Sequence, residues 1–277
     1  MTTSFTSIVK TVLGSSAGAL FLGYLGVIKP LQFYGKFAMY VVLVIIGATY
    51  GVGASIALGL VGMRGLSQWS TARIFEYLAN LFYGIKFDVE NKEALDSSRP
   101  AIFVVNHQSE LDIAVLGAMF PKWCSVTAKK ALKWYPFLGW FMWASGTVFI
   151  DRGRRDQAIQ AFDSAKKVML AQKQSVAMFP EGTRSYALDT KLLPFKKGAF
   201  HFAISAQVPI VPVVCQNYSR IWSHKYKRIT SGTIKIKVLD PVSTVGMGPE
   251  DVNQLLETVE KRMQDAYTDM GFAEMTA

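Results

Sequence analysis

The sequence AIFVVNHQSELD, at residues 101–112, is the strongest indication of how this chain folds. Its first five residues are apolar and rich in β-branched and aromatic side chains, which predicts a buried strand over 101–105. The polar residues that follow predict a turn and then a helix. Ser109 is a good N-cap, and Asp112 stands three positions later, as in a capping box. A strand that passes through a turn into a helix is a building unit of α/β proteins.

The same alternation continues on both sides of this segment. Apolar runs predict further strands at 125–128, 147–150, 175–179, 210–215 and 233–238, and amphipathic patterns predict helices at 70–83, 157–172 and 251–267. The run at 233–238 alternates polar and apolar residues, so we expect an edge strand with one solvent-facing side. Strands that alternate with helices predict an α/β fold.

The first 63 residues differ from the rest in composition. They contain no acidic residue and three lysines, and they include two uncharged runs, 11–28 and 37–63. A membrane-spanning helix needs about 20 apolar residues, so the second run is long enough, whereas serines and glycines make the first marginal. We expect residues 1–63 to form a pair of membrane-associated helices before a folded domain at 64–277. Two full spans, a hairpin within one leaflet and a buried helical pair remain open.

The overall composition excludes several classes of protein. Hydrophobic residues make up 51% of the 277 residues and charged residues 18%, which excludes a disordered, collagen-like or disulfide-stapled chain. The net charge of +10 favours an anionic partner, such as nucleic acid, a phosphorylated substrate or anionic lipid. We see no nucleic-acid-binding fingerprint. Cys124 and Cys215 lie in apolar runs and are expected to be buried free thiols, and we expect no bound metal.

His107 and Asp112 are the candidate catalytic pair. A histidine at the exit of a strand is well placed for proton transfer in a cleft. In one continuous helix, five residues correspond to about 500°, so the two side chains would point about 140° apart. They can meet only if His107 lies in the turn before the helix starts. Asp112 can then both cap the helix and hold the imidazole in one tautomer.

Two other predicted strands lead into segments suited to binding an anion. The strand at 175–179 runs into the turn sequence PEGTRS, and the strand at 147–150 runs into an aspartate and an arginine. Ligand sites in open α/β sheets lie at the carboxyl ends of strands, so we expect these segments to meet His107. Arg152 and Arg184 are the candidates for phosphate binding, because a guanidinium can bind a phosphate through two parallel hydrogen bonds.

Four segments together resemble the sequence blocks of the glycerolipid acyltransferase family. They have the same order and spacing, and they are NHQSELD at 106–112, GTVFIDR at 146–152, FPEGTRS at 179–185 and VPIVPV at 208–213. The first and third blocks look most like those of the 1-acyl-sn-glycerol-3-phosphate acyltransferases, in a eukaryotic, fungal-like form. The resemblance implies a mixed, largely parallel sheet flanked by helices, as in glycerol-3-phosphate acyltransferase, and it makes residues 64–277 the acyltransferase domain.

The resemblance also implies a chemistry. An enzyme of phospholipid biosynthesis would move an acyl group from acyl-CoA to the sn-2 hydroxyl of lysophosphatidic acid, giving phosphatidic acid. His107 would be the general base and Asp112 would orient it, without an acyl-enzyme. The residues that the resemblance implies for substrate binding are Lys130, Arg152, Glu181, Gly182, Thr183 and Arg184. Acyl-CoA is a co-substrate, and no bound cofactor is expected.

A lipid substrate implies a membrane partner, and we expect the endoplasmic reticulum membrane with a cytosol-facing active site. The aromatic segment 131–143 is expected to line the acyl path or to lie in the membrane interface, with an aromatic core under a loop as the alternative. Within the family, a glycerol-3-phosphate or another lysophospholipid acyltransferase remains open. From a different class, a membrane-tethered module that binds anionic lipid remains open.

Overall fold

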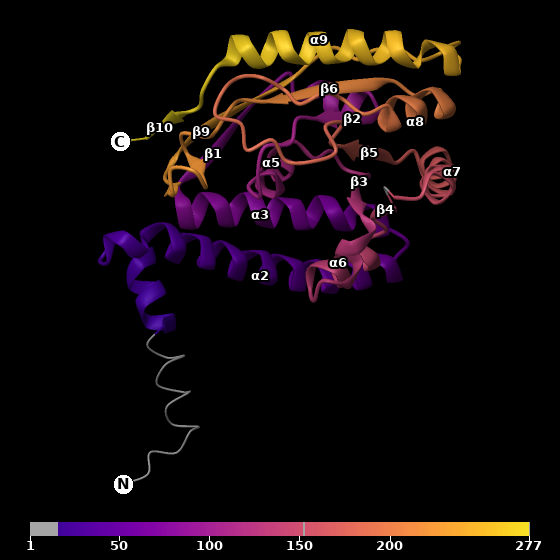
Figure 1. Cartoon of the computed structure of the whole chain (residues 1–277). Coiled ribbons are helices and arrows are strands. Elements are labelled where there is room, and N and C mark those ends of the chain that lie inside the picture. The colour runs from indigo at the N-terminus through magenta and orange to yellow at the C-terminus, as the bar shows by residue number, and fades with distance from the viewer. Residues whose placement is uncertain (1–15, 152, 277) are drawn as a thin grey trace.

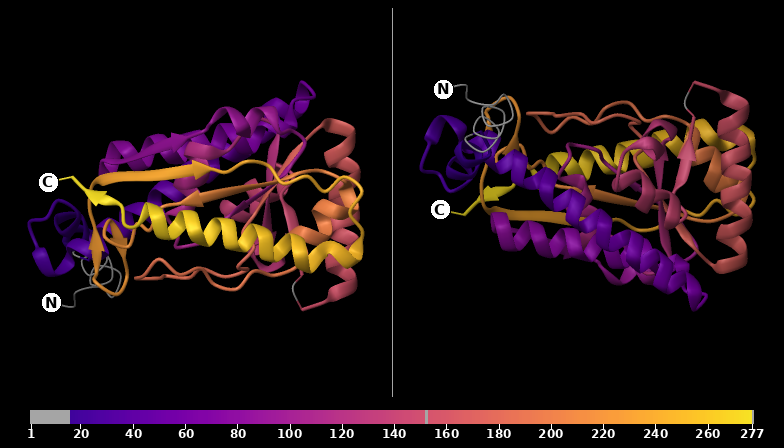
Figure 2. Two further views of the ribbon diagram at one scale, coloured as in Figure 1. Left: turned by 90° about the horizontal axis from the view of Figure 1, so that it is seen from above. Right: turned by 90° about the horizontal axis from the view of Figure 1, so that it is seen from below.

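The computed structural model of the chain describes residues 16–151 and 153–276 (Figure 1). A sheet forms the middle layer, with helices on both of its faces. Figure 2 shows α9 crossing one face, and α2 crossing the opposite side of the molecule. The longer helices are α2 (Gln32–Leu60), α3 (Ser67–Tyr83), α5 (Asp112–Met119), α6 (Leu138–Ala144), α7 (Arg155–Gln172), α8 (Gly198–Ala206) and α9 (Val252–Met270). Short helical segments are η1 (Lys29–Leu31), η2 (Arg64–Leu66), α4 (Glu93–Ser97), η3 (Lys130–Trp134) and η4 (Pro249–Asp251).

The main sheet has the strand order β1-β9-β6-β2-β5-β3-β4. Neighbouring strands along this path are parallel except β6 and β9, which are antiparallel. A short strand, β10, adds to β9 in antiparallel orientation, and β7 and β8 form a separate hairpin. The strands are β1 (Ile85–Glu90), β2 (Ile102–Val105), β3 (Cys124–Lys129), β4 (Val148–Ile150), β5 (Ser175–Met178), β6 (Ile210–Cys215), β7 (Trp222–Ser223), β8 (Arg228–Ile229), β9 (Gly232–Val238) and β10 (Glu274–Met275). The expected mixed, largely parallel sheet flanked by helices is therefore confirmed.

Each predicted strand is present with ends within one residue of the expected bounds, but the position of one is wrong. The strand at 233–238 is not an edge strand, because β9 lies between β1 and β6. Its alternation of buried and accessible residues is real, and it reports that one face of the strand is open rather than that one edge is. The edge on this side of the sheet is β1, whose sequence IKFDVE has the same alternation and was not predicted as a strand.

Two apolar clusters cover the two faces of the sheet, and β2 contributes to both. Phe103 and Val105 belong to the cluster under α3 and α5, whereas Ile102 and Val104 belong to the cluster under α7, α8 and α9. Successive side chains of a strand point to opposite faces, so a strand covered on both sides is apolar throughout. Burial of each such side chain contributes about 1.5–3 kcal/mol, which holds the end of β2 in a fixed position.

The long helix α2 packs along α3 on the outside of the molecule (Figure 1). Gly47 allows this close approach, because a Cβ atom there would lie 2.8 Å from the ring of Phe75 on α3. Tyr40 and Leu43 of α2 belong to the same apolar cluster as the sheet. The division of the chain at residue 63 stays a prediction, and α2 lies against the body of the fold rather than apart from it.

The N-terminal region is mostly helical where it is described, with a turn at residues 25–28. Residues 16–24 form a helix, and the first residues of the predicted helix at 11–28 lie outside the described residues. The second predicted helix, at 37–63, starts earlier than expected, since α2 begins at Gln32. Residues Lys29–Leu60 have the length and composition of a membrane-crossing helix. The side of α2 that faces away from α3 exposes large apolar side chains, including Val41, Val42, Ile45, Ile46, Ile56 and Leu60.

Candidate active site

His107 and Asp112 meet at the exit of the central strand β2. The strand ends at Val105, His107 lies in the turn, and α5 begins at Asp112. The Nδ1 atom of His107 is 2.7 Å from Oδ2 of Asp112. The two side chains therefore meet for the reason expected, which is that the imidazole precedes the helix. A carboxylate accepts this hydrogen bond, so Nδ1 carries the proton and Nε2 keeps its lone pair.

The Asp112 carboxylate is held by three further hydrogen bonds. Oδ2 also accepts from the backbone N–H groups of Gln108 at 2.7 Å and Ser109 at 3.1 Å, and Oδ1 accepts from the Tyr218 hydroxyl at 2.7 Å. The predicted helix start at Ser109 is wrong, because residues 109–111 form a turn that this carboxylate closes, and α5 begins at Asp112. Asp112 is only 2% exposed, so its direction toward the imidazole is fixed.

Two residues that follow β5, Phe179 and Glu181, contact His107. The ring of Phe179 stacks on the imidazole with the ring centroids 4.0 Å apart. Glu181 accepts the backbone N–H of His107 at 2.7 Å and that of Leu193 at 3.2 Å. Burial raises the pKa of the Glu181 carboxyl to about 7, although these two backbone hydrogen bonds lower it. Both oxygens thus bind backbone, and the predicted contact of Glu181 with substrate stays a prediction.

Arg184 pairs with Glu110, which follows His107 in the first motif. Its Nη1 atom is 2.8 Å from Oε1 of Glu110 and 3.4 Å from the hydroxyl of Tyr186. The other oxygen of Glu110 is 2.9 Å from Nε2 of His224. Burial opposes ionisation of Glu110, but hydrogen bonds from Tyr186 and His224, together with the charge of Arg184, lower its pKa below the usual value. Glu110 therefore stays ionised and fixes the direction of the guanidinium.

One cavity of about 520 Å³ joins these groups. The turns after β2 and β5 contribute His107, Gly182, Thr183 and Arg184 to its lining. Its other walls are mainly apolar and come from α3, α5, η3 and α6, with Phe75, Leu116, Leu132, Leu138, Phe141 and Met142 among them. Gly182 has a φ of +71°, a conformation that side chains with a Cβ rarely adopt. Glycine adopts this conformation without strain, so it suits the turn that lines the cavity after β5.

Lys130 and Arg152 are the two remaining residues that were predicted to bind substrate. Lys130 lies beside the site, with its Nζ atom 2.9 Å from Oε1 of Gln157 and 3.5 Å from Oδ2 of Asp151. Its neighbour Lys129 lines the cavity, and Lys130 does not. Arg152 lies outside the described residues. The roles predicted for both residues stay predictions.

The aromatic segment 131–143 has two sides. One side lines the cavity through Leu132, Leu138, Phe141 and Met142. The other side exposes Trp134, Tyr135, Trp140 and Trp143, and Trp134 is 80% exposed. A purely buried aromatic core is therefore wrong for this segment. The two short helices of this segment, η3 and α6, therefore contribute both to the wall of the cavity and to an exposed aromatic surface.

Three side chains that organise the site were missed by the sequence reasoning. Glu110 lies inside the first motif, and its acidic character beside an expected arginine was a usable signal. Tyr218 and His224 follow β6 and reach the site from more than a hundred residues away, so nothing in their local sequence indicates their partners. Cys124 and Cys215 are buried and free, as predicted. Among the described residues, no group of three or more His, Cys, Asp or Glu side chains is placed to hold a metal ion.

Three comparisons relate the chain to known proteins. Residues 86–216 match the family model described as Acyltransferase. The chain is 42% identical over 245 residues to the 1-acyl-sn-glycerol-3-phosphate acyltransferase of Saccharomyces cerevisiae, covering 86% of this chain and 80% of that protein. It is 36% identical over 207 residues to the human 1-acyl-sn-glycerol-3-phosphate acyltransferase alpha, covering 75% of this chain and 72% of that protein. The crystal structure of the 1-acyl-sn-glycerophosphate acyltransferase from Thermotoga maritima shares the fold, with a TM-score of 0.58 and 24% identity over 81% of this chain and 95% of that one.

Proposed function

Because this chain belongs to the acyltransferase family that contains the 1-acyl-sn-glycerol-3-phosphate acyltransferases, we propose that it converts lysophosphatidic acid to phosphatidic acid with acyl-CoA as donor. One observation carries the proposal. His107, which is paired with Asp112, and Arg184 line the same cavity, and the rest of that cavity is mainly apolar. A phosphorylated lipid alcohol needs a base, a cation for its phosphate and an apolar wall for its chain.

The proton transfer follows from the bonds around His107. Nε2 accepts the proton of the sn-2 hydroxyl while the hydroxyl oxygen forms a bond to the thioester carbonyl carbon. The carbon–sulfur bond then breaks, and the CoA thiolate takes the proton from the imidazolium, so the protein ends unchanged. Asp112 stabilises the imidazolium through Nδ1, and its buried hydrogen bonds keep it in place. Such general-base catalysis contributes about 10²–10⁴-fold.

The developing charge on the carbonyl oxygen needs a donor within the same cavity. We assign this role to the backbone N–H of Thr183, because the turn formed by Gly182 and Thr183 lines the cavity beside His107. The backbone N–H groups of His107 and Gln108 are already donated to Glu181 and Asp112. The turn after β5 therefore offers a donor that the turn after β2 cannot.

Arg184 suits the acceptor phosphate because only part of its guanidinium is used inside the protein. Nη1 makes the bonds to Glu110 and Tyr186, so Nε and Nη2 remain for a phosphate. Glu110 holds the fork in one direction before the ligand arrives. A fixed guanidinium loses less conformational freedom on binding than a mobile one.

The exposed apolar side chains of α2, η3 and α6, which we call the apolar surface, indicate how lipid reaches the cavity. The same segment that lines the cavity, η3 and α6, also exposes tryptophans suited to the headgroup region. We propose that the apolar surface lies in one leaflet of the membrane, which brings the cavity to the level of the lipid hydroxyl. A phospholipid-synthesising enzyme that takes acyl-CoA from the cytosol fits the endoplasmic reticulum membrane with a cytosol-facing site.

A comparison of acceptors tests the proposed function. The purified full-length chain is mixed with acyl-CoA and with lysophosphatidic acid, glycerol 3-phosphate or lysophosphatidylcholine, and the lipid products are separated. We expect phosphatidic acid from the first acceptor at the highest kcat/KM. Glycerol 3-phosphate lacks the chain that the apolar walls would hold, and the choline of lysophosphatidylcholine adds a cation beside Arg184. Turnover of either alternative acceptor without turnover of lysophosphatidic acid would contradict the proposal.

A further inference from the structure

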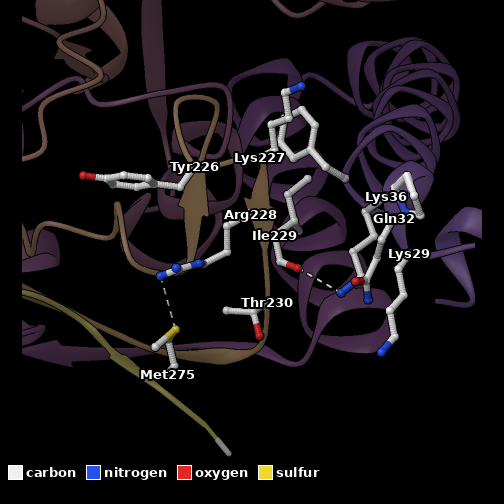
Figure 3. A pocket seen from close by; sticks show the side chains of 11 residues that line it. Lys29, Gln32, Lys36, Tyr226, Lys227, Arg228, Ile229, Thr230 and Met275 are labelled. Carbon is white, nitrogen blue, oxygen red and sulfur yellow. Dashed lines mark hydrogen bonds between the residues drawn. The ribbon is translucent and has the colours of Figure 1, made fainter.

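Another cavity, of about 390 Å³, lies between the start of α2 and the β7–β8 hairpin (Figure 3). Lys29 and Lys36 line it from the helical side, and Arg228 and Thr230 line it from the hairpin side. Its lining, within the described residues, contains no aspartate or glutamate. It also shares no lining residue with the cavity at His107. This part of the surface is therefore strongly basic and separate from the proposed active site.

Within the described residues, Lys36 and Arg228 at this cavity have only neutral partners. The Lys36 ammonium donates to the backbone carbonyl of Ile229 at 2.8 Å. The Arg228 guanidinium approaches the sulfur of Met275 at 3.8 Å and the backbone carbonyl of Arg220 at 3.5 Å. Lys29, Lys36 and Arg228 take part in none of the ion pairs within the described residues. Like charges gathered without a counter-ion repel one another, and a bound anion removes that repulsion.

An exposed apolar segment leads directly into the cavity. Phe21, Leu25 and Val27 precede Lys29 in the chain, and each is more than half exposed. On the other side, the Lys227 ammonium lies 5.4 Å from the centre of the Tyr34 ring, which is itself exposed. A free phosphate would use only the cations. A phospholipid would place its phosphate among the cations and its acyl chains along the exposed apolar side chains.

We propose that this cavity binds the phosphate of an anionic phospholipid from the membrane to which the protein is attached. The inference goes beyond the proposed reaction, because the cavity is separate from the one that contains His107. It also gives α2 a fixed starting point. Phe33, which lines the cavity, packs against His224, and Tyr40, further along α2, donates to the backbone carbonyl of Glu110. A lipid held here fastens α2 to the hairpin that carries His224.

A pair of charge-matched variants tests the proposal, with binding to vesicles as the main measurement. Arg228→Gln removes a cation that lines the cavity, and Lys225→Gln removes one from the same hairpin outside it. Binding of the full-length protein is measured on phosphatidylcholine vesicles with and without added phosphatidylglycerol. We expect Arg228→Gln to weaken binding to the anionic vesicles about fivefold, and Lys225→Gln to leave it nearly unchanged. Lys29→Gln is the second cavity variant and should repeat the loss.

The outcomes separate the possible sources of the phosphate. Equal losses in Arg228→Gln and Lys225→Gln would overturn the proposal, because they would show diffuse attraction rather than a site. Stabilisation of the detergent-solubilised protein by inorganic phosphate alone, lost in Arg228→Gln, would assign the cavity to a soluble anion. A raised KM for acyl-CoA in neutral micelles would assign it to the donor. An unchanged KM together with the selective loss on anionic vesicles is the result that supports a lipid headgroup.

Discussion

Two regions of the molecule hold their side chains in different ways. One is the pair of turns after β2 and β5, which carry His107 and Arg184. The other is the apolar surface of α2, η3 and α6. In the turns, the carboxylates of Glu110, Asp112 and Glu181 each accept two or more hydrogen bonds, and Asp112 accepts four. On the apolar surface, large side chains such as Ile46 and Trp134 are exposed. In the proposed function, the first region positions the reacting groups and the second region lies in lipid. The cavity at His107 is lined both by residues of these turns and by residues of η3 and α6.

The largest effect is expected from His107→Ala. Removal of the base should lower kcat for lysophosphatidic acid by about 10²–10⁴-fold, because the hydroxyl then loses its proton to water. Initial rates with acyl-CoA measure the change. His201→Ala is the matched control, since His201 lies exposed on α8. If His107→Ala folds and retains normal turnover, His107 is not the base, and the turns after β2 and β5 do not position the reaction.

The next effect is expected from Arg184→Gln. The loss of a charged hydrogen-bond donor to the phosphate should raise KM for lysophosphatidic acid by about 10–100-fold. The change in kcat should be much smaller, because the base is untouched. Glu110→Gln should give a weaker rise in KM, since the guanidinium stays but loses its fixed direction. An unchanged KM in Arg184→Gln would mean that the phosphate binds elsewhere.

A smaller effect, on stability rather than rate, is expected at Glu181. Its carboxyl has a usual pKa of 4.5, and burial raises it to about 7 in the folded protein. Between these values the folded state keeps a proton that the unfolded state has released, so the free energy of unfolding falls as the pH rises from about 4.5 to about 7. The loss is on the order of 1–3 kcal/mol. Denaturant unfolding at several pH values measures this dependence. The free energy of unfolding should change less with pH in Glu181→Gln than in the unmodified protein. An equal pH dependence in the two proteins would contradict a raised pKa for the Glu181 carboxyl.

The smallest effect is expected on the apolar surface. Trp134→Ala removes one exposed aromatic side chain and should weaken binding to neutral vesicles a few-fold. The rate in detergent should stay unchanged, because Trp134 does not line the cavity. Leu132→Ala, in the same short helix but on the cavity side, should instead change the rate and leave vesicle binding unaltered. The reverse pattern would show that the two sides of this segment are assigned wrongly.

Local sequence patterns predicted the elements well and their neighbours less well. The run 101–105 identified a central strand because both of its faces are covered, and the five-residue spacing of His107 and Asp112 led to the turn that brings them together. The alternation in 233–238 was assigned to an edge, since a pattern along one strand cannot show which strands pair with it. Tyr218 contacts Asp112 only because β6 lies beside β2, and strand order comes from the whole fold.

An experimental structure of the protein with lysophosphatidic acid bound tests the roles proposed for His107 and Arg184. If His107 is the base, the sn-2 hydroxyl lies about 2.6–3.2 Å from its Nε2 atom, while the phosphate contacts the Arg184 guanidinium. A hydroxyl out of reach of this imidazole, or a phosphate held by Arg228 and Lys29 instead, would contradict these roles.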